Sequence, residues 1–377
     1  YTRCILLLVG DWIEFVFGKD FCGEEEIMSK RGFIFIFTLV CLTYFSQTKE
    51  NQNFKDLDSL AKMIKYEGNL PELVNRLTTN CKTEEEKYRA IFIWITHNIG
   101  YDYKTYNQNR KPVKMKCNGK EDCEKKLAKL NNEIIDRVLS KKIAICDGYS
   151  KLFKRMCDMA NLNCSIVEGY IKNSPYQIGN MGILDHAWNV IRIDNEYYNV
   201  DATWASGYCT KNKKGKLNSF VKHYNDYYWL TENKDFFRNH FPKDRNWMND
   251  TGISMEYYKN QPYIEASEMP NLRFTKPESG ILNVKKGEKI KFEFTYDELV
   301  DKIQVNTNLY RNPSIWKTIK GKRELDKKAI EKQKFINYQQ VQNTFSFDIT
   351  ADNEKLNYIE IIFDYKTIAK FKIIVSK

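Results

Sequence analysis

The feature that most constrains this fold is a pair of alternating segments, residues 187–193 and 197–200, joined by a two-residue Asp-Asn turn. Apolar and polar side chains alternate along both segments, and a turn of this composition between them predicts a β-hairpin. His186 precedes the first segment and Asp201 follows the second. Neighbouring strands would place the imidazole and the carboxylate side by side. Such a pair fixes the tautomer of the ring and stabilises its charged form.

Cys146 is the third residue with chemistry in this part of the chain. It follows a short apolar run, residues 143–145, and precedes a segment whose apolar residues between 152 and 159 recur with helical periodicity. The thiol therefore falls at the N-terminus of a predicted helix, where the helix dipole and unpaired N–H groups lower its pKa. A thiolate beside a histidine and a carboxylate is the arrangement that an acyl-transferring nucleophile needs.

Each of these residues alone also has a structural explanation. A single cysteine is usually a small buried hydrophobe, a histidine is often a structural hydrogen-bonding residue, and Asp-Ala-Thr could form a turn. Their order along the chain, with a strand–helix junction for the thiol and a hairpin for the other two, favours catalysis. Tyr149, Trp188 and Trp204 are the candidate substrate-binding residues. Core packing is their alternative, most of all for Trp188.

Three motifs carry a resemblance to a known family: C-D-G-Y-S-x-L-F from Cys146, D-H-A-W-N-x-I from Asp185 and Y-N-V-D-A-T-W from Tyr198. They resemble the transglutaminase-like (papain-fold) superfamily, and within it the branch of kyphoscoliosis peptidase and bacterial transglutaminase-like core proteins. Residues 90–102 resemble the helix that precedes the catalytic core in this superfamily. Two stretches between residues 228 and 247 resemble the kyphoscoliosis-type extension after it.

The resemblance implies an α+β fold with a papain-like core, in which helices pack on an antiparallel sheet. It implies Cys146 as nucleophile, His186 as general base and acid, and Asp201 as the residue that orients the ring. The superfamily contains transglutaminases, peptidases, deglycosylating amidases and members without activity, so the type of acyl transfer stays open. A papain-type oxyanion glutamine is absent from residues 140–145, which leaves the second oxyanion donor unassigned. No dense acidic cluster suggests calcium, and we expect neither a metal nor a cofactor.

Beyond residue 260 the pattern changes to short alternating runs. Three prolines between residues 262 and 277 indicate a linker, and no helical periods separate the runs that follow. Short strands at such intervals predict a small β-sandwich of immunoglobulin-like character. We therefore expect a catalytic domain over residues 47–262 and a β-sandwich domain over residues 270–377. The expected strands are residues 281–284, 289–296, 302–308, 344–349, 358–365 and 368–375.

Residues 28–46 have the outline of a secretory signal peptide. A basic start at residues 28–31 is followed by a nearly continuous apolar run over residues 32–45 and by a polar stretch from Ser46. The apolar run has 14 residues, which is short of the ~20 that span a bilayer. The sequence therefore favours cleavage near Ser46 over a transmembrane anchor.

A mature chain without residues 1–46 would be secreted, periplasmic or part of the cell envelope, and not an integral membrane protein. Residues 1–27 are interpreted as upstream translation rather than structure. A lipoprotein anchored at Cys41 is a weaker alternative, because bulky rather than small residues surround this cysteine.

Removing residues 1–46 takes away four basic and six acidic side chains and leaves a net charge of +13. The lysines are spread along the chain without a nucleic-acid-binding motif, so we expect no nucleic-acid partner. They predict a solvated basic surface, with weak attraction to anionic polymers as the alternative. The expected partners are a protein or peptide substrate and, through the C-terminal domain, a component of the cell envelope or extracellular space.

Seven cysteines lie after residue 46, and setting Cys146 aside leaves an even six, which suggests disulfides in an exported protein. We expect a bond between Cys117 and Cys123, because the loop between them is polar and turn-prone. The other pairings stay open. A zinc site is a weak alternative, since the sequence has no C-x-x-C pair.

The sequence thus predicts an exported cysteine-dependent acyl-transfer enzyme that acts on peptide or carboxamide bonds, as a peptidase, amidase or transglutaminase. The alternative is a non-catalytic papain-fold binding or scaffold protein of the cell envelope. In that case Cys146 would be buried or disulfide-bonded, or His186 would point away from it.

Overall fold

The structure, a computed structural model, describes residues 7–9, 12–14, 54–108, 116–212, 214–248, 252–319 and 322–377. The chain divides into two compact units, residues 1–55 and 56–377. In the first unit, β1 (Leu7–Val9) pairs antiparallel with β2 (Trp12–Glu14). The signal peptide predicted at residues 28–46 lies outside the described residues. Among the helices described, none is long and apolar enough to cross a membrane.

The second unit begins with a group of helices built around α3 (Glu84–Asn98). Every side chain of α3 between residues 88 and 96 is buried, as expected of a helix enclosed by other elements. Thr83 caps it by accepting a 3.1 Å hydrogen bond from the N–H of Glu86. The other helices are α2 (Leu70–Thr78), α4 (Tyr103–Tyr106), α5 (Lys120–Lys141) and α6 (Cys146–Met159). A further helix covers residues 54–63, all but the first two of which belong to this unit.

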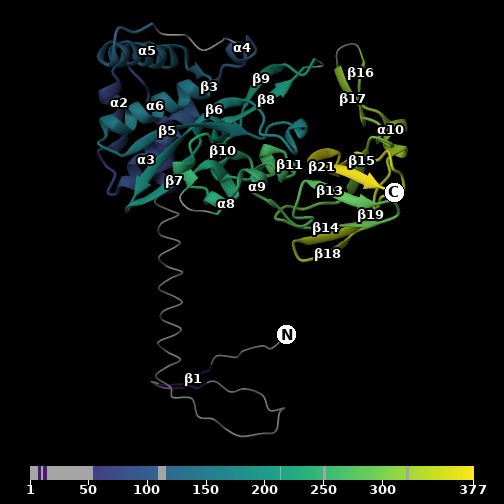
Figure 1. The fold of residues 1–377 in the computed structure, drawn as a ribbon. Helices are drawn as coiled ribbons and strands as arrows, with labels where there is room; N and C mark the ends of the chain where they lie inside the picture. Colours follow the sequence, from purple (N-terminus) through teal and green to yellow (C-terminus); the bar gives the residue numbers. More distant parts are fainter. Residues whose placement is uncertain are drawn as a thin grey trace. The chain divides into compact units, whose positions relative to one another are not determined.

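Of these helices, α6 packs directly on β5 and β6 of an antiparallel sheet with the strand order β10–β5–β6–β7 (Figure 1). The predicted hairpin is confirmed, since β6 and β7 are joined by Asp194 and Asn195. Both turn residues have positive φ, 49° and 70°, the left-handed conformation that a tight hairpin turn of this type requires. The strands are β5 (Cys164–Ile171), β6 (Leu184–Ile193), β7 (Glu196–Val200) and β10 (His240–Pro242).

Two small sheets flank the main sheet. In one, β3 (Gly100–Tyr101) pairs parallel with β4 (Ile143–Ala144), and β4 leads into α6 with only Ile145 between them. The predicted strand–helix junction is therefore confirmed. In the other, β8 (Gly207–Lys211) pairs antiparallel with β9 (Leu217–Lys222). Short helices complete this part: α7 (Ala202–Ala205), α8 (Asn233–Phe236) and α9 (Met255–Asn260).

The C-terminal part consists of two sheets that share one apolar core. One sheet has the order β11–β21–β20–β15, with β13 parallel to β21, and the other has the order β12–β14–β19–β18. A strand lies at each of the six predicted positions. The strands are β11 (Tyr263–Ile264), β12 (Leu272–Lys276), β13 (Ile281–Lys285), β14 (Lys289–Tyr296), β15 (Ile303–Thr307), β18 (Gln339–Val341), β19 (Thr344–Thr350), β20 (Tyr358–Phe363) and β21 (Lys366–Ser376).

A further hairpin, β16 (Trp316–Ile319) with β17 (Lys322–Leu325), and the short helix α10 (Lys327–Glu331) follow β15. The protein is thus an α+β chain with a sheet-rich C-terminal region. The immunoglobulin-like character of that region and the domain boundaries stay predictions. Within the segment expected as a linker, β11 pairs with β21, Tyr263 opposite Lys370, so part of this segment belongs to the C-terminal sheet.

Candidate active site

Cys146 is the first residue of α6. Ile145, directly before it, is extended. The Cys146 side chain is 7% exposed, and its Sγ lies 3.6 Å from the backbone oxygen of Asp185 on β6. The N–H groups in the first turn of a helix have no acceptor within the helix, and the helix dipole adds positive potential there. The sulfur therefore lies where a negative charge is stabilised.

Buried hydrogen bonds tie the first turn of α6 to β6. The hydroxyl of Ser150 lies 3.0 Å from the backbone oxygens of both Cys146 and Ala187. The side chain of Asn189 donates to the backbone oxygen of Ser150 at 3.1 Å. Because Ala187 follows His186 directly, these bonds hold the nucleophile-bearing helix against the strand that carries the histidine.

His186 and Asp201 form the pair that the hairpin predicts. Nε2 of His186 lies 2.7 Å from Oδ2 of Asp201, and both side chains are buried. Asp201 is also the N-cap of α7, and its Oδ1 accepts the N–H groups of Thr203 and Trp204 at 2.8 and 3.1 Å. The cap fixes one carboxylate oxygen and leaves the other for the ring. Because Nε2 faces Asp201, Nδ1 is the ring nitrogen left for Cys146.

His186 and Asp201 each stabilise the charged form of the other. Burial lowers the pKa of His186, but the negative charge and hydrogen bond of Asp201, together with Cys146, outweigh it and raise this pKa to about 10. Burial would raise the pKa of Asp201, but His186 and then His240 overcome it and hold that pKa below its usual range. At neutral pH the His186 ring is therefore protonated, as required of the partner of a thiolate.

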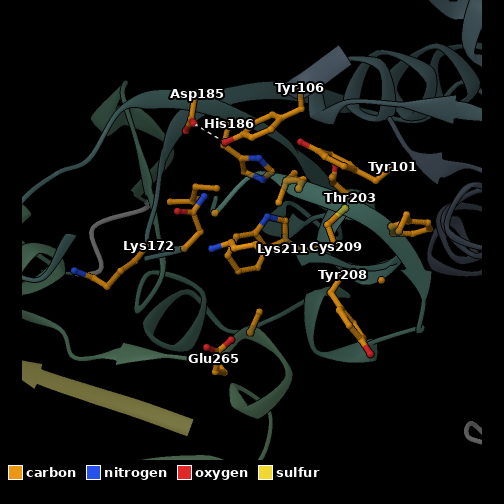
Figure 2. A pocket seen from close by; sticks show the side chains of 18 of the residues that line it. Tyr101, Tyr106, Lys172, Asp185, His186, Thr203, Tyr208, Cys209, Lys211 and Glu265 are labelled. Carbon is orange, nitrogen blue, oxygen red and sulfur yellow. Dashed lines mark hydrogen bonds between the residues drawn. The ribbon is translucent and has the colours of Figure 1, made fainter. Parts of the chain in front are cut away.

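His186 faces a cavity of about 440 Å³ (Figure 2). This volume lies in the range of small-molecule and side-chain sites, roughly 300–1,000 Å³. Tyr106 lies beside His186, and its hydroxyl donates to Oδ2 of Asp185 at 3.4 Å. The β8–β9 hairpin and the segment that follows β11 supply further walls. The imidazole is thus accessible from a space that can hold a substrate side chain.

Residues 71–202 match the sequence profile of the transglutaminase-like superfamily, and this range includes Cys146, His186 and Asp201. This part of the chain is therefore similar to a transglutaminase-like domain. Human kyphoscoliosis peptidase is 31% identical over 224 residues, which are 59% of this chain and 30% of that protein. Hillarin from Drosophila melanogaster is 25% identical over 228 residues, which are 56% of this chain and 25% of that protein.

The matches thus cover less than a third of the length of these curated relatives. The crystal structure of a TGase is similar over 50% of this chain and 43% of that chain, at 19% identity. Its TM-score is 0.26, so the similarity in shape is weak.

A second histidine joins this site from outside the range that matches the family. Nε2 of His240, on β10, lies 3.1 Å from the same Oδ2 of Asp201 that binds His186. Burial lowers the pKa of His240 to about 4, despite its hydrogen bond to Asp201. Its ring is therefore neutral near pH 7 and carries one N–H. With that proton on Nε2 the ring donates to the carboxylate of Asp201, and with it on Nδ1 the ring donates to Oδ1 of Asn239, which lies 2.6 Å away.

Sequence reasoning did not assign a role to His240. The stretch H-F-P-K-D-R-N-W carries only a resemblance to the kyphoscoliosis-type extension. The strand β10 has three residues and places His240 opposite Ile171 of β5. Gly169, two residues earlier on β5, permits this packing, because a Cβ there would lie 2.4 Å from atoms of Phe241 and Trp188. The signal that could have found His240 is its presence in a motif of the transglutaminase-like resemblance.

Of the three predicted substrate-binding residues, the structure places one at the cavity and two in the core. Trp204 lines the cavity. Tyr149 is a core residue whose hydroxyl donates to the backbone oxygen of Ile99 at 2.8 Å. Trp188 is also in the core, with Nε1 donating to Oδ1 of Asn199 at 2.8 Å. These two are therefore corrected to packing residues, because helical and strand periodicity turn their side chains inward, away from the cavity.

The cluster of His186, Asp201 and His240 has the residue types of a metal site, and its candidate ligand atoms lie within 4.8 Å of one another. Two ligands of one tetrahedral ion, each about 2.0–2.2 Å from it, lie about 3.4 Å apart. The nitrogen–oxygen separations here are 2.7 and 3.1 Å. The cluster therefore fits hydrogen bonds between these three side chains better than metal coordination.

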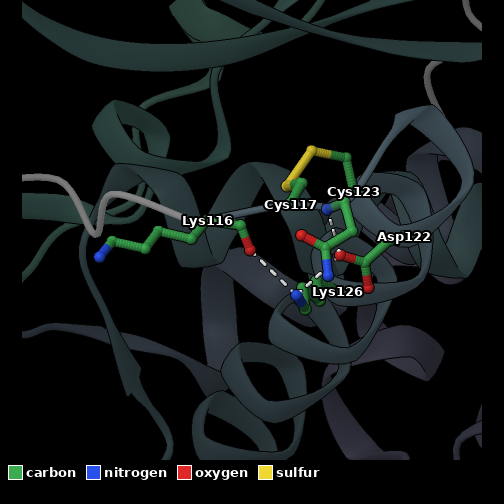
Figure 3. Close-up of a disulfide and its surroundings, with 6 residues drawn as sticks. Lys116, Cys117, Asp122, Cys123 and Lys126 are labelled. Carbon is green, nitrogen blue, oxygen red and sulfur yellow. Dashed lines mark hydrogen bonds and ion pairs between the residues drawn. A yellow bond between two sulfur atoms is a disulfide. The ribbon is translucent and has the colours of Figure 1, made fainter.

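The bond between Cys117 and Cys123 is confirmed, with an S–S distance of 1.99 Å (Figure 3). Next to it, Nζ of Lys126 binds the backbone oxygen of Lys116 at 2.9 Å and the carboxylate of Asp122 at 2.7 Å. These contacts fix the start of α5, which begins at Lys120.

The remaining cysteines of the expected even set are free thiols, which corrects the expectation of further disulfides. They lie on separate elements and are partly or fully buried: Cys81, Cys157, Cys164 and Cys209. Burial raises the pKa of both Cys81 and Cys209 to about 11. Cys209 lines the same cavity as His186, but at neutral pH it is protonated and a poor nucleophile.

Proposed function

We propose that this protein is a cysteine-dependent acyl-transfer enzyme that cleaves peptide or carboxamide bonds through a thioester. The observation that supports the proposal best is the 2.7 Å hydrogen bond between His186 and Asp201, with Cys146 at the start of α6 as the third member. The match of residues 71–202 to the transglutaminase-like superfamily agrees with it. The similar human protein is named kyphoscoliosis peptidase, a name that refers to that protein and not to this chain.

In the proposed first step, the thiolate of Cys146 attacks the carbonyl carbon of the substrate, and a C–S bond forms. The tetrahedral intermediate then collapses, the C–N bond breaks, and the proton on Nδ1 of His186 passes to the leaving amine. Asp201 holds the ring in orientation and stabilises its charged form. The products of this step are a thioester on Cys146 and a free amine.

In the second step an acceptor attacks the thioester carbon, and the C–S bond breaks. His186 takes a proton from the acceptor as it attacks, and Cys146 leaves as the thiolate. Water as acceptor gives a carboxylic acid and makes the protein a peptidase or amidase. A lysine amine as acceptor gives a new amide and makes it a transglutaminase.

A peptide library incubated with and without a primary amine, followed by mass spectrometry, tests the proposal. Hydrolysis converts a carboxamide to an acid or splits a peptide, whereas amine transfer adds the mass of the amine with loss of ammonia or a peptide fragment. Cys146→Ala is expected to abolish either product while the protein stays folded by circular dichroism. The enzyme proposal is contradicted if the wild-type protein forms no product, or forms only products that Cys146→Ala also forms.

Iodoacetamide alkylation provides a second test that does not depend on the substrate. Cys146 is expected to react first at pH 7, because burial keeps Cys81 and Cys209 protonated. The reacted residue is identified by peptide mass spectrometry. A folded, reduced wild-type protein whose Cys146 resists iodoacetamide would contradict an activated thiolate.

A non-catalytic binding protein is the second candidate, and the low exposure of Cys146, 7%, is the observation that favours it. In that case the cavity beside His186 would bind a peptide without turnover. Saturable binding of library peptides that is equal in the wild type and in Cys146→Ala, with no product in either, would support this function.

We also propose that the mature protein is exported. The disulfide between Cys117 and Cys123 supports this, because such bonds persist mainly in oxidising compartments. N-terminal sequencing of protein recovered from the medium or periplasm is expected to show a start near Ser46. Recovery of the protein only from the cytosol, with residues 28–46 still attached, would contradict export.

A further inference from the structure

A thiolate that attacks a carbonyl carbon leaves a negative charge on the carbonyl oxygen, and enzymes of this type stabilise that charge with preorganised hydrogen-bond donors. The N–H of Cys146 is one available donor, because the first turn of α6 offers it no acceptor. The segment before the nucleophile, residues 140–145, has no side-chain amide. A second donor must therefore come from another part of the fold.

Tyr101 is placed beside the nucleophile by the pairing of β3 with β4. In this parallel pair Tyr101 lies opposite Ala144, two residues before Cys146. The pairing is fixed on both sides, since Gly100 N–H donates to the oxygen of Lys142 and Asp102 N–H to the oxygen of Ala144, each at 2.8 Å. A side chain at Tyr101 is thereby held close to the start of α6.

The side chain of Tyr101 lines the same cavity as the ring of His186. Figure 2 shows its hydroxyl directed toward the side of the cavity on which His186 lies. The ring of Tyr101 packs against that of Tyr106, with centroids 6.0 Å apart and planes at 54°. This contact sets the direction of the hydroxyl without using its hydrogen-bonding capacity.

Within the described part of the chain, the Tyr101 hydroxyl has no hydrogen-bond partner. The hydroxyls of two neighbouring tyrosines are already engaged. Tyr106 donates to the carboxylate of Asp185, and Tyr149 donates to the backbone oxygen of Ile99. Of these three tyrosines, Tyr101 alone has a donor free to bind an atom that enters the cavity.

The Tyr101 hydroxyl also keeps its proton under the conditions in which the thiolate exists. Burial, followed by the nearby charges of Cys146 and Tyr106, raises the pKa of Tyr101 well above its usual value. A hydroxyl that stays protonated is a donor at neutral and moderately alkaline pH.

We propose that Tyr101 is a catalytic residue whose hydroxyl donates the second hydrogen bond to the oxyanion of the tetrahedral intermediate, beside the N–H of Cys146. The proposal rests on the acyl-transfer function proposed above. In a papain-type enzyme a glutamine supplies this second oxyanion donor. Here we assign it to Tyr101 on β3, which lies 45 positions before Cys146 in the sequence.

The test compares two reactions of the same sulfur in Tyr101→Phe, which keeps the aromatic ring and removes only the hydroxyl. Acylation of Cys146 by p-nitrophenyl acetate passes through an oxyanion, whereas alkylation by iodoacetamide is a displacement at a saturated carbon and forms none. Loss of one oxyanion donor costs about 10²–10³ in rate, so acylation is expected to slow by roughly 10²-fold. Alkylation is expected to stay within about twofold.

Tyr103→Phe is the matched control, because Tyr103 lies two residues further along and does not line the cavity. Both reactions are expected to keep their wild-type rates in it. Acylation is followed by release of p-nitrophenol, and both modifications are mapped to Cys146 by peptide mass spectrometry.

Two results with Tyr101→Phe would overturn the assignment. Acylation at the wild-type rate would show that the hydroxyl does not act on the oxyanion. Acylation and alkylation slowed in parallel would show that Tyr101 acts on the thiolate or on the fold. A wild-type protein that is alkylated but never acylated would instead contradict the proposed function, and with it this assignment.

Discussion

The two apolar cores of residues 56–377 differ in the side chains at their centres. The core around α3 and α6 encloses a connected polar cluster of His186, Asp201, Asn239 and His240, each at most 6% exposed. The C-terminal core is dominated by phenylalanine rings, such as the stacked Phe294–Phe345 pair with centroids 5.6 Å apart.

The comparison of the two cores indicates which one serves the reaction and which one serves the stability of the fold. A buried polar group costs free energy unless it is fully hydrogen-bonded, so a connected polar cluster in a core is expected where a function requires it. Aromatic packing carries no such requirement and contributes apolar burial and ring–ring contacts. Substitutions in the first core should therefore affect the reaction most, and substitutions in the second should affect the free energy of unfolding.

The largest effect is expected from Asp201→Asn. The amide presents no negative charge to His186, so the raised pKa of the ring and its orientation are both lost. Loss of this partner costs about 10⁴-fold in a related triad, and we expect acyl transfer to slow by roughly 10³–10⁴-fold. The rate of p-nitrophenol release measures it. Asp194→Asn, in the exposed hairpin turn, is the control and should keep wild-type activity; equal rates in both variants would refute the role of Asp201.

A smaller effect, and one of the opposite kind, is expected from Phe294→Ala. Removing a buried phenylalanine leaves a cavity and costs about 3–5 kcal/mol of unfolding free energy. Chemical denaturation followed by fluorescence measures this loss, with Phe335→Ala, at a side chain 44% exposed, as the control. The rate of Cys146 alkylation at 25 °C should not change. A change in that rate would show that the two cores are coupled and that the comparison above is too simple.

The smallest effect is expected from His240→Phe. This change removes one hydrogen bond to the charged Asp201, worth about 1.5–3 kcal/mol, and we expect acyl transfer to slow roughly 10-fold. His240→Gln keeps a donor and is expected to recover part of the rate. His223→Gln, at an exposed histidine, is the control. Full activity in His240→Phe would mean that His240 only fills space.

The same variant is also expected to change how stability depends on pH. The pKa of His240 is lowered to about 4 in the folded protein, against about 6.5 in an unfolded chain. The unfolded state therefore binds more protons between these values, and stability present above pH 6.5 is lost as the pH falls toward 4. His240→Phe should lose this acid dependence. His186, with its pKa raised to about 10, should contribute stability that is lost as the pH rises from about 6.5 through 10.

Local sequence patterns predicted the elements that carry the proposed triad. The alternation before and after Asp194 and Asn195 predicted the β6–β7 hairpin, and so the pairing of His186 with Asp201. The change from an apolar run to helical periodicity placed Cys146 at the start of α6. A polar loop of five residues predicted the bond between Cys117 and Cys123. These features depend on neighbours in sequence, where periodicity and turn chemistry act directly.

The tertiary structure alone decided the groups that reach the site through short strands. Tyr101 comes beside Cys146 through a two-residue parallel strand, and His240 reaches Asp201 through a three-residue strand 39 positions away. It also decided that Tyr149 and Trp188 face the core while Trp204 faces the cavity. Strands this short have no periodicity of their own, and their pairing is set by the packing of the whole core. The sequence by itself therefore determined which residues could do the chemistry, and the fold determined what surrounds them.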